Sequence, residues 1–174
     1  MIPTRHDMVV TKWGARFCGR RMPCSIGRGG ISASKTEGDG VTPSGIWRIA
    51  GAGFRADRIA KPRRQSPPGF HMRAIGPHDI WSDDPADPAY NHAVRAINHP
   101  FGHEKLRLRD PLYDIVLMSD WNWPDAVPGK GSAIFVHYWR RPRYPTAGCI
   151  AFSPRDLQWI VMRWQRQSRI FVQP

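Results

Sequence analysis

The residues of this sequence best suited to covalent chemistry are a cysteine and a histidine. Cys149 follows Gly148 in the tetrapeptide Thr-Ala-Gly-Cys, and His137 stands twelve residues earlier, at the end of the apolar run 132–137. A thiol directly after a glycine can present its sulfur and its own backbone N–H toward one point, while an imidazole from a neighbouring strand accepts its proton. The pattern predicts a Cys/His site for acyl transfer.

Neighbouring groups are expected to activate this thiol. A free cysteine has a pKa of about 8.5, so little of it is thiolate at neutral pH, and an adjacent imidazole increases its reactivity. On the predicted strand, Phe135 and His137 share one face with residue 133, and His137 is the expected base. The N–H groups of Gly148 and Cys149 form the expected oxyanion hole, because glycine allows a substrate to approach the backbone closely.

A glycine-rich segment precedes these residues. Positions 35–45 read Lys-Thr-Glu-Gly-Asp-Gly-Val-Thr-Pro-Ser-Gly. Together with His137 and the motif at 146–149, this segment resembles the YkuD-type L,D-transpeptidase catalytic domain, whose members carry [Ser/Thr]-x-Gly-Cys behind a histidine. The resemblance covers residues 24–160. It implies a mainly β fold, a YkuD-like β-sandwich or barrel-like sheet with one or two peripheral α-helices.

The resemblance also implies a reaction and roles for single residues. Cys149 would form a thioester with a peptidoglycan stem tetrapeptide and expel its terminal D-alanine, and an amine or water would then accept the acyl group. His137 would act as the base, with its imidazole oriented by the backbone carbonyl of Tyr138. Thr146, counted among the substrate-binding residues, would fix the nucleophile loop. The expected partner is a stem peptide or muropeptide, and neither a metal nor an organic cofactor is expected.

Two positions depart from the pattern of the family. Many members have a histidine between the hydroxyl residue and the glycine, and Asn or Arg two positions after the cysteine; this chain has Ala147 and Ala151 there. Contacts to a substrate carboxylate therefore need another source. The short loop between base and nucleophile carries Arg140, Arg141 and Arg143, and we expect arginines of this cluster to bind the substrate.

The strongly basic composition leaves a second class of function open. The formal net charge is +12 and the pI is about 10.6, a balance typical of proteins that bind nucleic acid or other polyanions. The arginines are scattered, however, and no helix-turn-helix, zinc-finger or RNP pattern accompanies them, so nucleic acid is not the expected partner. The alternative function is a catalytically inactive module that binds a polyanion such as a wall polymer or nucleic acid.

Other polar residues do not form a recognised site. Asp83, Asp84, Asp87 and His92 lack the spacing of an EF-hand or of an HExxH motif, so no metal site is expected. The glycines at 27–30 lack the lysine and the following helix of a phosphate loop. Segments of this middle region recur in compact members of the same family without an assigned role, and they contain Asp83, Asp84, His103 and Glu104.

Cysteine usage and hydrophobic runs bear on the compartment. An odd number of cysteines, with one in a reactive motif, is typical of free thiols in a reducing environment. The first ten residues lack the apolar core of a secretory signal, and no run reaches the length of a membrane-spanning helix, about 18 apolar residues. We therefore expect a cytoplasmic protein that hydrolyses recycled soluble muropeptides, or a periplasmic one if an export signal was removed.

Frequent turn residues predict the architecture. Seventeen prolines and sixteen glycines exclude long helices nearly everywhere and favour short strands. One helix is expected after Ser153, which can cap it, with Pro154 in its first turn. No repeat or linker divides the chain, so residues 1–174 are expected to form one domain. The predicted strands cover residues 8–11, 17–25, 46–50, 115–118, 133–138, 149–152 and 170–172.

Two further expectations concern charged and irregular segments. Arg163, Arg166 and Arg169 are expected near the C-terminal end of the helix, where cations are favoured. Residues 51–111 are polar and rich in turn residues, so we expect a long irregular region there. A region of this kind either serves function or is ordered by its own contacts.

Overall fold

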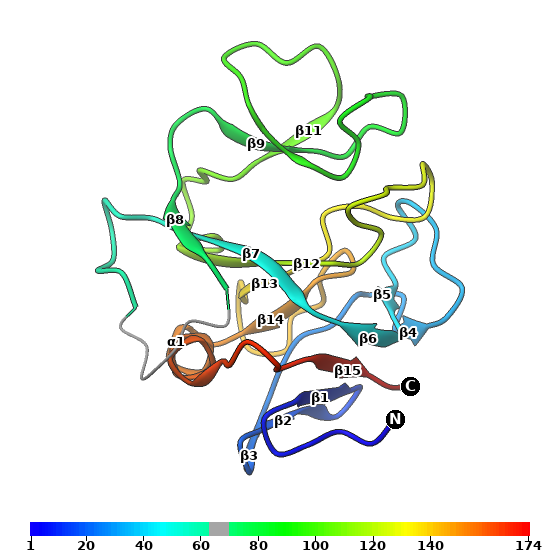
Figure 1. The fold of residues 1–174 in the computed structure, drawn as a ribbon, viewed down its shortest axis with the longest axis vertical. Coiled ribbons are helices and arrows are strands. Elements are labelled where there is room, and N and C mark those ends of the chain that lie inside the picture. The colour runs from blue at the N-terminus through cyan, green and yellow to red at the C-terminus, as the bar shows by residue number, and fades with distance from the viewer. Residues whose placement is uncertain (63–69) are drawn as a thin grey trace.

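The computed structural model describes residues 1–62 and 70–174 (Figure 1). Within them the regular structure consists mainly of short β-strands, with a single α-helix at the edge of the molecule. The strands form two sheets of five strands, one of three and one of two, and none of these sheets closes on itself. The prediction of a mainly β fold is confirmed, in its sandwich form and not as a barrel.

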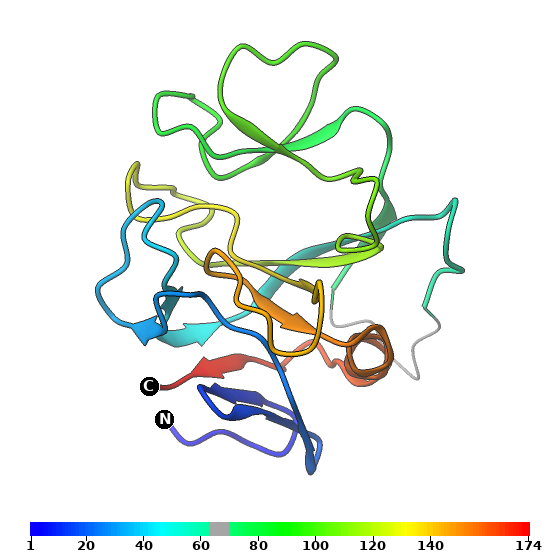
Figure 2. The same cartoon turned by 180° about the vertical axis from the view of Figure 1, so that it is seen from behind.

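The lower sheet in Figure 1 joins the two ends of the chain. It contains β1 (Met8–Thr11), β2 (Gly14–Phe17), β3 (Arg20–Met22), β6 (Gly45–Trp47) and β15 (Ile170–Val172). The strand order is β3-β2-β1-β15-β6, and β1 pairs in parallel with β15. The N-terminal and C-terminal segments therefore lie side by side (Figures 1 and 2).

The central sheet contains the strand on which the predicted base, His137, lies. It contains β7 (Ile49–Phe54), β8 (Met72–Ala74), β12 (Ile115–Ser119), β13 (Phe135–Tyr138) and β14 (Ile150–Phe152). The order is β14-β13-β12-β7-β8, and β13 runs parallel to β14 but antiparallel to β12. Every residue of β12, β13 and β14 is buried, as in sheets that are covered on both faces.

Two apolar clusters cover the opposite faces of the central sheet. On the lower face, residues such as Leu117 pack against the lower sheet and against α1 (Pro154–Arg163). On the upper face, Phe135 packs against Trp81 and Tyr113 with edge-to-face ring contacts. Because successive residues of a strand point to opposite faces, β12 and β13 contribute to both clusters.

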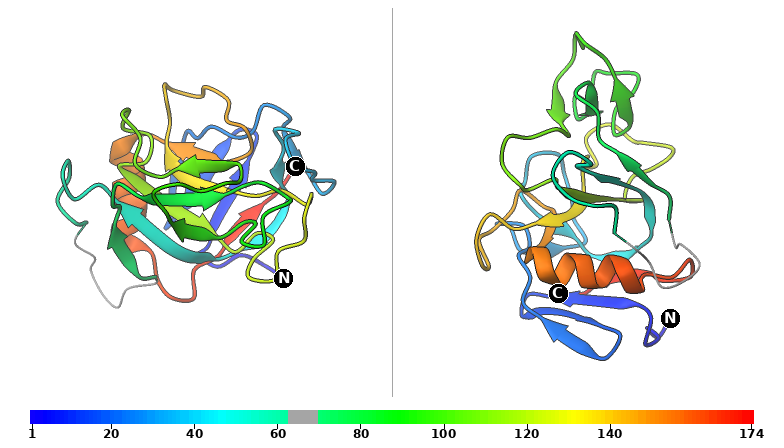
Figure 3. Two further views of the ribbon diagram at one scale, coloured as in Figure 1. Left: turned by 90° about the horizontal axis from the view of Figure 1, so that it is seen from above. Right: turned by 90° about the vertical axis from the view of Figure 1, so that its left-hand side faces the viewer.

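The helix forms where the sequence predicts it. Ser153 caps α1, since its Oγ accepts the backbone N–H of Asp156 at 3.1 Å. The helix lies at one end of the sandwich (Figure 3), and its apolar stripe is buried in the core. In the described part of the chain, no helix has the length and apolar composition needed to cross a membrane. The buried residues of the stripe are Leu157, Ile160, Val161 and Trp164.

Three predicted placements differ from the structure. Residues 17–25 are not one strand: Cys18 (φ 47°) and Gly19 (φ 78°) form a turn that reverses the chain between the end of β2 and β3. Residues 46–50 are divided between two sheets, into β6 and β7. The helix ends at Arg163, so Arg166 and Arg169 lie beyond it.

Residues 51–111 are more regular than the sequence suggests. They include a three-stranded sheet, β10-β9-β11, which forms the upper layer in Figure 1. All residues of β9 (Asp79–Ser82) are buried, and the Asp79 carboxylate accepts hydrogen bonds from Arg73 and from the Gly76 backbone. The layer is thus ordered by its own polar contacts. The remaining strands are β10 (Ala93–Arg95), β11 (His103–Lys105), β4 (Ile31–Ser32) and β5 (Thr42–Pro43).

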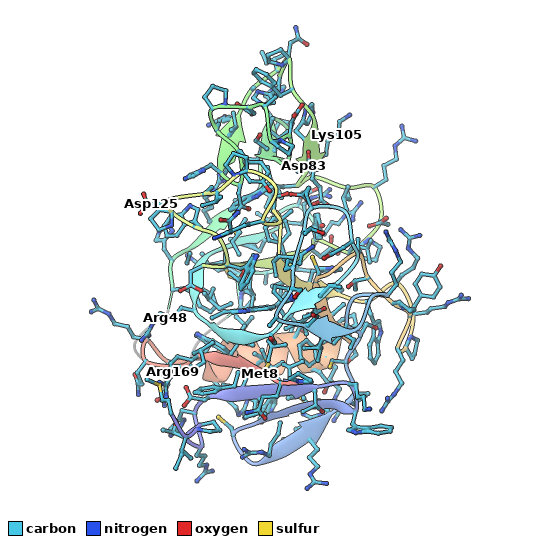
Figure 4. The ribbon with its side chains drawn as sticks, turned by 90° about the vertical axis from the view of Figure 1, so that its right-hand side faces the viewer. Met8, Arg48, Asp83, Lys105, Asp125 and Arg169 are labelled. Atoms are coloured by element: carbon cyan, nitrogen blue, oxygen red, sulfur yellow. The ribbon has the colours of Figure 1, made fainter. Side chains whose placement is uncertain are left out.

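Asp7 ties the two ends of the chain together. Its carboxylate accepts hydrogen bonds from Arg169 Nε at 3.1 Å, from the other guanidinium nitrogen at 2.8 Å and from the Arg169 backbone N–H at 2.9 Å. Arg169 lies beside Met8 at this end of the molecule (Figure 4). Burial alone would raise the pKa of Asp7, but the hydrogen bonds from Arg169 and Thr4 outweigh it and hold that pKa well below its usual value.

Replacing Asp7 with Asn should destabilise the fold by about 2 kcal/mol, because it leaves the Arg169 guanidinium without its buried partner. The folded pKa of Asp7 lies below its unfolded value of 3.8, so this stability is present above pH 3.8 and is lost as the pH falls toward the folded pKa. Urea unfolding of both proteins at about pH 7 and about pH 3 should show a smaller difference at the lower pH. Asp125→Asn, at an exposed position, is the control and should change neither value; equal losses for both variants would contradict the clamp.

Candidate active site

Strand pairing in the centre of the molecule brings Cys149 and His137 together. β13 and β14 run parallel with His137 opposite Ala151, and Cys149 directly precedes β14. The backbone N–H of Phe135 donates to Cys149 Sγ at 3.3 Å. Both Cys149 and His137 line one cavity of about 710 Å³. The charged residues that line it are Arg28, Lys35, Glu37, Asp83, Glu104 and Arg140.

The His137 imidazole is buried and held in one orientation. Its Nδ1 lies 2.7 Å from the carbonyl oxygen of Tyr138, and the Tyr113 ring packs edge-on against it at 5.2 Å between centroids. A carbonyl only accepts, so Nδ1 carries the proton and Nε2 is the acceptor of the neutral ring. Burial lowers the pKa of His137 to about 4, against the opposing effect of the Tyr138 hydrogen bond. The ring is neutral at neutral pH and can accept a proton.

The Cys149 thiol rests against the backbone that leads into β13. The thiol accepts the Phe135 N–H and donates to the carbonyl oxygen of Ala133 at 3.1 Å. Among the described residues, no hydrogen bond joins the thiol to His137. Burial raises the pKa of Cys149 to about 12, and the charge of Glu104 acts in the same direction. The Cys149 thiol is therefore neutral at neutral pH, and its hydrogen-bond acceptor is Ala133 and not His137.

Position 148 requires glycine. Gly148 has a φ of 142°, and a Cβ at this position would lie 2.9 Å from the carbonyl oxygen of Val41. The Gly148 carbonyl accepts the Thr42 hydroxyl at 2.7 Å, and the same hydroxyl accepts the N–H of Gly27 at 2.8 Å. The glycine-rich segment at 35–45 thus packs directly beneath the nucleophile loop and supports it.

Thr146 closes the nucleophile loop on itself. Its hydroxyl donates to the Cys149 carbonyl at 2.6 Å and accepts the Gly148 N–H at 3.2 Å. These two bonds fix the backbone around the thiol. They also engage one of the two expected oxyanion donors, so the Gly148 N–H would have to leave Thr146 before it could bind a substrate oxygen.

The three loop arginines lie in different places. Arg140 lines the cavity. The Arg141 guanidinium stacks over the Tyr144 ring at 4.3 Å from its centroid. Arg143, in the left-handed region with φ 58°, donates to the Trp13 carbonyl at 3.4 Å and lines a separate hollow. Of these three arginines, only Arg140 faces the cavity that contains the thiol.

Two tyrosine–carboxylate pairs form part of the cavity region, and the sequence assigned no role to them. The Tyr113 hydroxyl donates to Glu104, and the Tyr90 hydroxyl donates to Glu37. Burial raises the pKa values of Tyr113 and Glu104, and it raises that of Tyr90 to about 12. The only sequence signal for these pairs was that segments of the middle region recur in compact members of the family. Those segments do not show which tyrosine bonds to which carboxylate.

Asn91 joins the upper layer to the strand that carries the site. Its Oδ1 accepts hydrogen bonds from Trp81 Nε1 and from the Ala133 N–H, both at 3.0 Å. Its Nδ2 donates to the carbonyls of Trp121 and Asn122. Asn91 and Ala133 have φ values of 57° and 51°, a region that is strained for alanine. These bonds therefore hold the Ala133 carbonyl in the position where the thiol meets it.

Most acids of the middle region have structural partners. Asp87 lies 2.6 Å from His99 Nε2, and Asp84 accepts the Gly102 N–H at 3.1 Å. Asp83 differs because it lines the cavity, where burial raises its pKa. Within residues 1–62 and 70–174, no group of three or more His, Cys, Asp or Glu side chains could hold a metal ion.

One protein family accounts for nearly the whole chain. The structure is an open β-sandwich in which a cysteine and a histidine share one cavity. The family described as YkuD, the L,D-transpeptidase catalytic domain, matches residues 4–172. The chain therefore belongs to the YkuD family, as its motifs predict. No curated protein and no solved structure matches the chain significantly.

Replacing Glu104 with Gln removes a negative charge that raises the Cys149 pKa. We expect alkylation of Cys149 by iodoacetamide at about pH 8 to become about threefold faster, which corresponds to a pKa lowered by about half a unit. Peptide mass spectrometry separates this thiol from Cys18 and Cys24. Asp84→Asn removes a charge outside the cavity lining and is the matched control. An unchanged rate in the Glu104 variant, or equal acceleration in both, would contradict the coupling.

Proposed function

We propose that this protein is a cysteine acyl transferase that cleaves peptidoglycan stem tetrapeptides at the L,D bond before the terminal D-alanine. The observation that supports this proposal most directly is the cavity shared by Cys149 and His137. In it, the Tyr138 carbonyl holds His137 Nδ1 and leaves Nε2 as the proton acceptor. Membership of a family of L,D-transpeptidase catalytic domains supports the reaction class.

The first half-reaction forms a thioester. The substrate displaces the thiol from the Ala133 carbonyl, the Cys149 proton passes to His137 Nε2, and the sulfur attacks the carbonyl carbon of the L,D bond. The Cys149 N–H stabilises the oxyanion, joined by the Gly148 N–H once that group has left the Thr146 hydroxyl, and one donor of this kind is worth about 3 kcal/mol. The C–N bond then breaks, His137 returns the proton to the leaving amine, and D-alanine departs.

The second half-reaction transfers the acyl group to an acceptor. Water that gives its proton to His137 attacks the thioester, the C–S bond breaks, and the thiol is restored with release of the tripeptide. An amine in place of water gives a cross-link or an exchanged D-amino acid. On free tetrapeptide we propose water as the acceptor, because it needs no binding site, and exchange when a D-amino acid is present in excess.

The charges of the cavity suit a peptide that carries carboxylates. Arg28 and Arg140 are exposed at its lining and have no ion pair within the described residues. Lys35, in contrast, is buried and paired with Asp39 at 2.6 Å. Arg28 and Arg140 are therefore the cations we assign to substrate carboxylates, with partly shielded contacts worth about 1.5–3 kcal/mol.

The alternative of an inactive polyanion-binding module has less support. Its motivation was the net charge together with Ala147 and Ala151, which replace polar residues of the family pattern. Ala151 is fully buried in β14 and pairs with His137 in the register. Having alanine and not a polar residue at that position leaves both the proposed nucleophile and the proposed base in place. A salt-titrated binding assay set against tetrapeptide turnover separates the two functions.

Replacing Cys149 with Ala should abolish release of D-alanine from a purified tetrapeptide with little loss of fold, because the covalent step needs the sulfur. His137→Ala should leave a small residual activity, since the thiol then lacks its base. Mass spectrometry of the products, with and without an excess of a D-amino acid, measures both reactions. Cys18→Ala is the control and should retain full activity.

A carbapenem should acylate the same thiol, and the mass increment should map to Cys149. Modification of Cys18 or Cys24 in its place would contradict the assignment. A tetrapeptide assay that yields cross-linked dimer and no tripeptide would make transpeptidation the primary activity.

Replacing Arg140 with Gln should raise the KM for tetrapeptide about tenfold with kcat nearly unchanged, because the loss of one charge-assisted contact weakens binding. The salt dependence of KM should become weaker as well. Arg141→Gln is the matched control, since that guanidinium stacks on Tyr144 and does not line the cavity. Equal KM values for both variants would show that Arg140 does not contact the substrate.

A further inference from the structure

A second hollow, of about 440 Å³, lies on the N-terminal strands and shares no lining residue with the cavity of Cys149. β1, β2 and β3, at the bottom of Figure 1, contribute most of its lining, and the loop between β13 and β14 adds one side chain. Trp13, Arg16, Arg21 and Arg143 line it, and no acidic residue does. Residues far apart in the sequence thus place positive charge around one hollow.

Two arginines of this hollow are placed so that their like charges destabilise the folded state. Arg16 and Arg21 stand directly opposite each other in the β2–β3 pairing. Like charges at directly opposite positions of two antiparallel strands are destabilising. Neither they nor Arg143 form an ion pair within the described residues. Their charge therefore has no carboxylate to offset it, and an anionic ligand would supply the missing partner.

Trp13 adds a flat apolar surface beside these guanidinium groups. Its side chain is 73% exposed, although tryptophan is usually well buried. The Arg143 guanidinium donates to its carbonyl at 3.4 Å, so the indole and the loop arginine belong to one arrangement. Lys12 Nζ lies over one face of this ring, 5.2 Å from its centroid, so the opposite face of the exposed indole is the one suited to stack on a planar ring that carries an anionic group.

We propose that this hollow binds a nucleoside diphosphate. Three guanidinium groups call for about two to three negative charges, which a diphosphate supplies and a single carboxylate does not. Guanidinium groups bind phosphate oxygens in bidentate fashion, and the nucleobase stacks on Trp13. The site is separate from the proposed acyl transfer, because neither Cys149 nor His137 takes part in it.

Isothermal titration of the full chain at low salt with ADP, inorganic pyrophosphate and adenosine tests the proposal. ADP should bind more tightly than either of its parts. The double variant Arg16→Gln/Arg21→Gln should weaken both ADP and pyrophosphate at least about tenfold, because both ligands use the guanidinium groups. Trp13→Ala should weaken ADP about fivefold and leave pyrophosphate unchanged, because only ADP has a ring to stack.

Arg95→Gln/Arg166→Gln removes the same charge from exposed positions outside the hollow and is the matched control. Equal losses in the two double variants would show that the net charge, not the hollow, attracts the ligand, and would overturn the proposal. Adenosine binding as tight as ADP would overturn it too, as would a short single-stranded oligonucleotide that binds far more tightly than ADP. If the Arg16/Arg21 variant does not fold, Arg143→Gln serves in its place, with the same expected losses.

Discussion

The parallel pairing of β13 with β14 is the constraint on which the site depends. Parallel neighbours need a crossover connection, and here residues 139–149 make it without a helix. The pairing sets His137 on one strand opposite the start of the next, so that Cys149 arrives beside Phe135 at the edge of the same cavity. A shift of one residue in this register would turn His137 to the opposite face of the sheet and separate the imidazole from the thiol.

The layer above the central sheet holds this arrangement in place through buried polar contacts. Asn91 satisfies four partners and fixes Ala133 in a left-handed conformation. From the other side, Thr42 binds the carbonyl of Gly148. Unsatisfied buried polar groups are costly, so such a network is stable only when each member keeps its partner. Buried hydrogen bonds therefore hold the backbone on both sides of the thiol, at Ala133 and at Gly148.

The thiol and the imidazole of the site are both uncharged in this structure. Burial raises the pKa of the Cys149 thiol to about 12 and lowers that of His137 to about 4, so both groups are neutral at neutral pH. A preformed thiolate–imidazolium pair is thus disfavoured in this structure. Glu104 strengthens this preference, since its charge opposes a thiolate.

The sequence by itself determined the mainly β class, the family and the capped helix, and it indicated the cysteine and histidine of the candidate site, because contiguous residues and short-range spacing carry these signals. Only the tertiary structure decided that Arg140 lines the cavity while Arg141 and Arg143 do not. It also decided that the middle region is a three-stranded sheet, whose strands are too short and too polar to show the alternation that predicts a strand. The tertiary structure likewise decided the protonation states of the thiol and the imidazole, and it placed two arginines opposite each other on β2 and β3. Each depends on burial or on pairing between residues distant in the chain, and such contacts exist only once the sheets have packed.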